Sequence, residues 1–81
     1  MDKILVTGAA GFIGFHLSKQ LLKEKYLVFG IDNLNNYYDV KLKKDRISYL
    51  NKSKNFFFNK IDLSNKNKIN KIITQNKIKY I

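Results

Sequence analysis

Three glycines and one aspartate hold the positions at which this chain could bind a phosphorylated ligand. Gly8, Gly11 and Gly14 follow a short apolar run and open a segment with helical periodicity. Such a turn presents free backbone N–H groups and the positive end of a helix dipole, which together bind a diphosphate. Asp32 ends the next apolar run, 18 residues after Gly14, where a carboxylate can accept ribose hydroxyls and repel a 2′-phosphate. We therefore predict a dinucleotide site that takes NAD rather than NADP.

Each glycine has a separate expected role. Gly8 lets the chain leave the strand at a φ angle that a side chain resists, and Gly11 lets the backbone approach phosphate without a Cβ. Gly14 lets the helix pack closely against the sheet. A plain strand, turn and helix is the simpler alternative, but it does not explain why the glycines and Asp32 share the spacing of a cofactor site.

Strand-like and helix-like segments alternate along the chain, which predicts an α/β fold. We expect the N-terminal part of a Rossmann-type doubly wound parallel sheet, with three strands plus the start of a fourth that pairs with the far side of the first. The predicted strands are residues 3–7, 27–32 and 56–61, the predicted helices are residues 12–25, 40–50 and 64–76, and residues 77–81 begin the fourth strand.

Each predicted helix carries an apolar stripe at helical spacing. Ser64 is expected to cap the third helix, whose isoleucines face inward. The stripes are Ile13, Leu17 and Leu21 in the first helix, Val40, Ile47 and Leu50 in the second, and Ile69, Ile72 and Ile73 in the third.

The glycine turn resembles that of a known enzyme family. Residues 7–14, Thr-Gly-Ala-Ala-Gly-Phe-Ile-Gly, look like the turn of the extended short-chain dehydrogenase/reductase family, specifically its nucleotide-sugar epimerases and dehydratases. Residues 30–43 are similar to the stretch after the second strand in the UDP-glucuronate 4-epimerase branch, and residues 56–63 resemble the family's third strand. The resemblance covers most of the 81 residues.

The resemblance implies a role for each matching residue. Phe12 and Ile13 offer backbone N–H groups to the pyrophosphate of NAD. Around the adenosine, it implies that Asp32 binds the ribose and that Asn33 and Asn36 line the adenine-ribose pocket. It also implies that Asp62 and Leu63 flank the adenine.

The family's catalytic serine or threonine, its tyrosine and lysine pair and its sugar-binding region lie after the fourth strand. The resemblance therefore implies that residues 1–81 are an incomplete N-terminal portion of an NAD-binding domain, without the substrate domain and inactive alone. Tyr37 and Lys41 have the spacing of the catalytic pair, but they follow Asp32 at the adenosine end. We interpret Tyr37 and Tyr38 as loop aromatics and Lys41 as a solvated side chain.

Three functions stay open at this point. The first is a UDP-glucuronate 4-epimerase, which oxidises the C4 hydroxyl of a nucleotide-sugar with bound NAD and then reduces the ketone again. The second is a nucleotide-sugar 4,6-dehydratase, which shares the first half-reaction. The third is a truncated, non-catalytic NAD-binding module. For either enzyme, the resemblance implies a homodimeric full-length protein.

The net charge of +10 raises the question of nucleic-acid binding, which we reject. Residues 1–32 carry +1, residues 33–63 carry +4 and residues 64–81 carry +5. Fifteen lysines accompany the single Arg46, whereas base and phosphate recognition usually enlists arginine. The excess charge therefore indicates solvated lysines.

Composition also bears on whether metal sites, disulfides or membrane-spanning segments are expected. The chain has no cysteine and one histidine, His16, so disulfides, thiolate sites and a zinc site built by this chain alone are not expected. It has no apolar run of about 18 residues and no signal pattern. We predict no membrane span and a cytoplasmic location.

Overall fold

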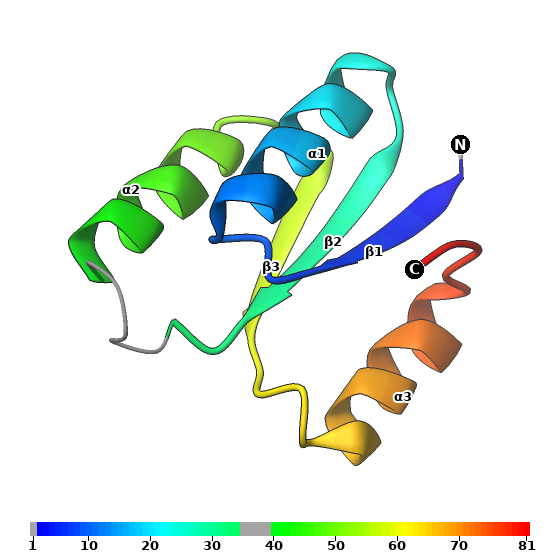
Figure 1. Cartoon of the computed structure of the whole chain (residues 1–81). Helices are drawn as coiled ribbons and strands as arrows, with labels where there is room; N and C mark the ends of the chain where they lie inside the picture. Colours follow the sequence, from blue (N-terminus) through cyan, green and yellow to red (C-terminus); the bar gives the residue numbers. More distant parts are fainter. Residues whose placement is uncertain (1, 35–39) are drawn as a thin grey trace.

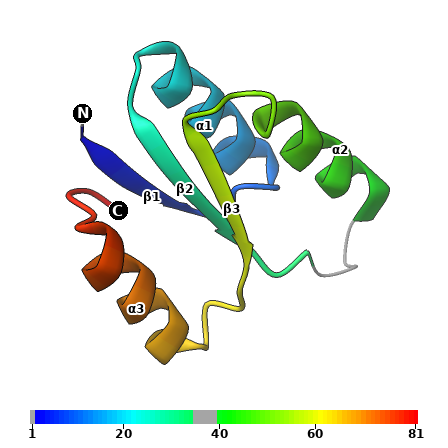
Figure 2. The same cartoon turned by 180° about the vertical axis from the view of Figure 1, so that it is seen from behind.

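The computed structural model describes residues 2–34 and 40–81, which form a three-layer α/β/α arrangement (Figure 1). Three parallel strands lie in the order β1-β2-β3. Two helices, α1 and α2, cover one face of the sheet, and α3 covers the other (Figure 2). The predicted α/β fold is confirmed. The elements are β1 (Lys3–Thr7), α1 (Phe12–Lys23), β2 (Leu27–Asp32), α2 (Val40–Leu50), β3 (Phe56–Lys60) and α3 (Lys66–Asn76).

The register brings the ends of the three strands to one edge of the sheet. Thr7 of β1 pairs with Ile31 of β2, and Asp32 pairs with Lys60 of β3. Because the strands are parallel, the segments that follow them meet at this carboxyl edge, which is where doubly wound sheets bind ligands.

After α3 the chain returns to the free edge of β1. Tyr80 forms a parallel bridge with Ile4. The Leu5 N–H donates to the Tyr80 carbonyl at 2.8 Å, and the Lys79 N–H donates to the Lys3 carbonyl at 2.9 Å. The predicted start of a fourth strand beside the first is therefore confirmed.

Two apolar clusters hold the layers together, because strand side chains alternate between the faces of the sheet. On one face, the α1 and α2 side, Val6, Val28 and Phe56 pack with Ile47 and Leu50 of α2. On the other face, Leu5, Phe29 and Ile31 pack with the α3 residues Ile69, Ile72 and Ile73, as predicted for α3.

Helix α1 approaches the sheet closely through small residues, and of its predicted apolar stripe only Leu21 packs against the core cluster. Ile13 is 79% exposed and Leu17 is 47% exposed, whereas Ser18 is fully buried. A Cβ on Gly14 would lie only 2.1 Å from the Gly8 carbonyl oxygen. Gly14, Ser18 and Leu21 share one helical face, so the small residues allow the close approach and the larger Ile13 and Leu17 are turned outward.

Two helix boundaries differ from the prediction. Helix α1 ends at Lys23 rather than Lys25, because Lys25 has a φ of +73°. Helix α3 begins at Lys66 with Asn65 as its N-cap, and the Asn65 side chain accepts the Lys68 N–H at 3.2 Å. The predicted Ser64 cap is wrong, because the Ser64 N–H donates to the Asp62 carboxylate at 2.8 Å in a turn before the helix.

Strand β3 also ends one residue earlier than predicted, at Lys60. Within the described residues, no helix combines the length and apolar character that a membrane span needs.

The close contact at Gly14 predicts opposite effects for two substitutions on one face of α1. Gly14→Ala should lower the free energy of unfolding by about 1–3 kcal/mol, because the added Cβ meets backbone that cannot move aside cheaply. The steric cost of the added Cβ should exceed the gain of about 1 kcal/mol in helix propensity, so the net effect is destabilising. Ser18→Ala is the matched control and should be neutral or stabilising, since the buried Ser18 hydroxyl has no hydrogen-bond partner among the described residues. Urea unfolding checks both, and a Gly14→Ala variant as stable as Ser18→Ala would contradict the packing argument.

Candidate nucleotide-binding site

The turn between β1 and α1 has the geometry of a phosphate-binding loop. Gly8 has a φ of +66°, in the left-handed region that glycine enters most readily. The Gly11 N–H donates to the Gly8 carbonyl at 2.9 Å, and the Ala9 N–H donates to the Ile31 carbonyl at 3.0 Å. Gly11 is the N-cap of α1 and provides no side-chain cap. The turn is thus tied to the end of β2 while the first turn of α1 opens at the carboxyl edge.

Asp32 at the end of β2 fixes the segments around this edge. It is only 7% exposed. Its Oδ2 accepts the Ala10 N–H at 3.0 Å, and its Oδ1 accepts the Leu34 N–H at 2.7 Å. The ammonium of Lys43 on α2 lies 3.8 Å from Oδ1. One carboxylate therefore links the glycine turn, β2, the segment after β2 and α2.

A pocket of about 290 Å³ lies beside Asp32 at the carboxyl edge. It is formed where the residues after all three strands meet, and it brings together six of the predicted site residues. Asn36 lies outside the described residues, as do Tyr37 and Tyr38. The pocket is lined by Gly8, Gly11, Asp32, Asn33, Asp62 and Leu63 from the prediction, and also by Ile31, Lys43 and Ile61.

Asp62 gives this pocket a second negative charge. Its pKa is held below its ordinary value, chiefly by the backbone N–H of Ser64 and further by the Ser64 hydroxyl and the Asn33 amide. The Asn33 Nδ2 donates to Asp62 Oδ2 at 3.4 Å. Leu63 beside it is 58% exposed and offers apolar surface. The far wall of the pocket therefore combines a carboxylate with an apolar side chain.

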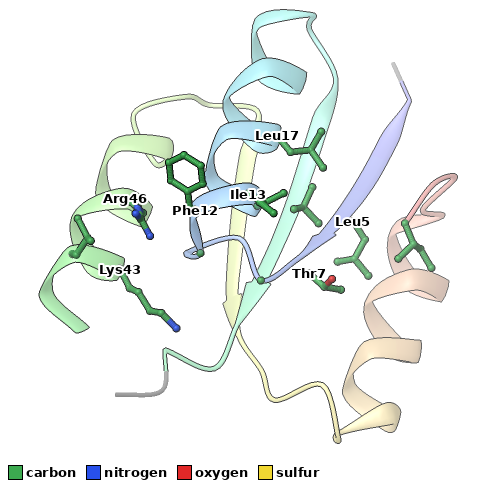
Figure 3. Close-up of a pocket in the computed structure, with 13 residues that line it drawn as sticks. Leu5, Thr7, Phe12, Ile13, Leu17, Lys43 and Arg46 are labelled. Atoms are coloured by element: carbon green, nitrogen blue, oxygen red, sulfur yellow. The ribbon is translucent and has the colours of Figure 1, made fainter. Parts of the chain in front are cut away.

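A larger pocket of about 790 Å³ lies on the other side of the glycine turn (Figure 3). Phe12 and Ile13 project into it from α1, and Lys43 and Arg46 extend toward it from α2. The Arg46 guanidinium also donates to the Ala10 carbonyl at 3.0 Å. Gly14 lines this pocket, while Gly8 and Gly11 line both. The predicted site residues thus surround two pockets that share the glycine turn.

Sequence reasoning missed three residues of this region. Lys43 lies on the same face of α2 as Ile47 and Leu50 and is buried with them. A lysine in an apolar stripe was the signal that could have revealed it. Arg46 gave no comparable pattern. Gly30 of β2 was also missed, although a Cβ there would lie 2.8 Å from the Ala9 side chain. Lys41, by contrast, is solvated as interpreted and pairs with Asp45 at 3.1 Å.

The comparison with protein families matches residues 5–81 to the family described as GDP-mannose 4,6 dehydratase. The chain belongs to this family. It is 50% identical over 70 residues to Protein CapI of Staphylococcus aureus, which is 86% of this chain and 21% of that protein. It is 54% identical over 65 residues to UDP-glucuronate 4-epimerase of Thermodesulfobacterium geofontis, 80% of this chain and 20% of that protein.

One solved structure of a relative has the same fold as this chain. It is the UDP-glucuronic acid 4-epimerase of Bacillus cereus in complex with UDP-glucuronic acid and NAD, with a TM-score of 0.81 and 38% identity, covering 98% of this chain and 26% of that one. The chain spans about a fifth of the length of the curated relatives it matches. The epimerase and dehydratase resemblance of the glycine turn is confirmed.

The buried pair of Asp32 and Lys43 predicts strong thermodynamic coupling. Asp32→Asn should cost about 3 kcal/mol of unfolding free energy, because it removes the carboxylate that lies beside the buried Lys43 ammonium. Adding Lys43→Met should recover part of that loss. A double-mutant cycle in urea measures the coupling.

The control cycle uses the exposed pair of Lys41 and Asp45 on the same helix. Removal of either partner there should cost less than about 1 kcal/mol. Strictly additive effects of Asp32→Asn and Lys43→Met would show that the buried pair is not coupled.

Proposed function

We propose that this chain forms the part of an NAD site that holds the adenosine and diphosphate, in a protein that epimerises a nucleotide-sugar at C4. The observation that carries the proposal is the meeting of the glycine turn and the Asp32 carboxylate at one pocket of the carboxyl edge. A helix N-terminus for the diphosphate and a carboxylate for the ribose are the two groups that a dinucleotide requires at such an edge.

The adenosine belongs in the 290 Å³ pocket in this proposal. Each Asp32 oxygen already accepts one backbone N–H, and a carboxylate has about four acceptor sites. It therefore keeps capacity for the ribose hydroxyls. Asn33, Asp62 and Leu63 line the same pocket and are assigned to the adenine. The family resemblance adds Asn36 to this group.

The diphosphate belongs at the first turn of α1. The backbone N–H groups of Phe12 and Ile13 are assigned to its oxygens, aided by the helix dipole. Lys43 and Arg46 line the adjoining pocket and add positive charge on the α2 side. NAD bound there would supply the hydride acceptor for oxidation at C4 of the sugar.

UDP-glucuronate is the substrate that the relatives favour, since proteins named UDP-glucuronate 4-epimerase are among them. The family description favours a second candidate, a nucleotide-sugar 4,6-dehydratase. A product assay of the whole protein, run with UDP-glucuronate and with a nucleotide-hexose, distinguishes the two. Epimerisation leaves the mass of the sugar unchanged, whereas 4,6-dehydration removes one water and needs a C6 hydroxyl, which a uronate lacks. A homodimeric whole protein and a cytoplasmic location complete the proposal and rest on the family resemblance.

The phosphate-cradle assignment predicts that Gly11→Val weakens NAD binding strongly. A branched side chain at Gly11 occupies the space assigned to phosphate oxygens, so binding per folded molecule should fall at least tenfold. An added Cβ also lies 3.2 Å from the Gly8 carbonyl oxygen, and stability must therefore be measured in parallel. Calorimetric titration with NAD and thermal unfolding provide the two readouts.

Ile73→Ala on α3 is the control for destabilisation alone, since it weakens the apolar cluster on the opposite face of the sheet. Its folded fraction should bind NAD normally. A Gly11→Val variant that melts early and still binds NAD fully would refute the cradle, and absence of NAD binding by the parent chain would refute the proposed function.

Residues 1–81 alone should not convert UDP-glucuronate, even with NAD added. The family resemblance puts the catalytic tyrosine and lysine after the fourth strand, so no base is positioned at the C4 hydroxyl. Proton NMR of the sugar after prolonged incubation checks this expectation. Product formation above that of heat-inactivated protein would prove it wrong.

A further inference from the structure

Lys43 stands apart from the other lysines of this chain. All fifteen lie in the described ranges, and Lys43 alone is buried, at 8% exposure. It occupies an inward position of α2 and directs its ammonium to Asp32. It also lines both pockets beside the glycine turn. A cation in this position acts on whatever the two pockets bind.

Among the described residues, three of those that line the smaller pocket are charged. Asp32 and Asp62 are negative, and Lys43 is positive. Arg46 lines only the larger pocket and donates to the Ala10 carbonyl. Among the residues that line the adenosine pocket, Lys43 is therefore the group that offsets the two carboxylates.

We propose that Lys43 is a specificity-determining residue that weakens the discrimination of this pocket against a ribose 2′-phosphate. The inference rests on the proposed function, in which Asp32 accepts the ribose hydroxyls. A lone aspartate there repels a 2′-phosphate. Because the Lys43 ammonium lies 3.8 Å from Asp32 Oδ1 and lines the same pocket, it attracts a phosphate bound there, so the opposing effects partly cancel.

Burial makes this effect large enough to measure. The Lys43 and Asp32 side chains are 10% and 6% exposed, and buried charges are screened by salt far less than exposed ones. Opposite charges a few ångströms apart near a protein surface interact strongly enough to change an equilibrium tenfold or more. NAD remains the preferred cofactor, by a smaller margin than Asp32 alone would set.

The ratio of NAD to NADP affinity isolates this effect, because the two cofactors differ only in the 2′-phosphate. Lys43→Met should raise the ratio about tenfold, mainly by weakening NADP. The matched control is Lys44→Met, which removes the same charge from the exposed neighbouring position of α2 and should leave the ratio within twofold. Calorimetric titration of each variant with both cofactors measures the ratios, and thermal unfolding establishes that each variant is folded. Lys43→Gln replaces Lys43→Met if the latter is unfolded.

A second comparison covers the case in which NADP binding to the parent chain is too weak to measure. Asp32→Asn removes the repulsion and keeps Lys43, so the ratio should shift toward NADP by at least tenfold. Lys43→Met in the Asp32→Asn background should reverse that shift.

The outcomes separate the two proposals. A parent chain that binds no NAD overturns the proposed function and this inference together. A parent chain that binds NAD, with ratios that Lys43→Met leaves unchanged in both backgrounds, overturns the inference alone. Equal loss of both cofactors does so as well, because Lys43 then acts on the diphosphate or on folding.

Discussion

The carboxylate of Asp32 is the group on which the geometry of the carboxyl edge depends. It ends β2, accepts N–H groups from the glycine turn and from Leu34, and faces the Lys43 ammonium. Buried polar groups are costly when a partner is missing, so the three segments that supply these partners are held in one arrangement around the end of β2. The same carboxylate is the acceptor assigned to the ribose. Positioning of the site and stability of its surroundings therefore rest on the same contacts.

Close packing at the glycine turn is the second constraint, and it determines how α1 faces the rest of the molecule. The space between Gly14 and the Gly8 carbonyl admits no Cβ. The helix consequently approaches the sheet through Gly14 and Ser18 and turns Ile13 and Leu17 into the larger pocket. The apolar wall of that pocket is thus a consequence of the small residues through which the helix contacts the sheet.

The sequence predicted the elements well because hydrophobic periodicity and glycine spacing are local properties. Strands, helices, the fourth-strand start and the glycine turn all follow from such patterns. The errors arose where one specific side-chain contact decides the outcome. Helix α3 starts at Lys66 because Asp62 engages Ser64. Lys43 became part of the site through pairing with Asp32, 11 positions away, which no periodic pattern records. Asn36 stays a prediction, because it lies outside the described residues.

The distribution of charge explains why a strongly basic chain can carry a pocket of the opposite character. Nearly all of the lysines lie on exposed positions, where each interacts mainly with water and salt. The described residues that line the smaller pocket include two carboxylates and one ammonium, so together they carry a negative charge although the chain carries +10 overall. Net charge governs solubility and weak nonspecific association, whereas ligand selection depends on the few charges that are buried beside the ligand. In this chain, the buried charges beside the ligand pocket are those of Asp32 and Lys43, and the exposed Asp62 lies at its rim.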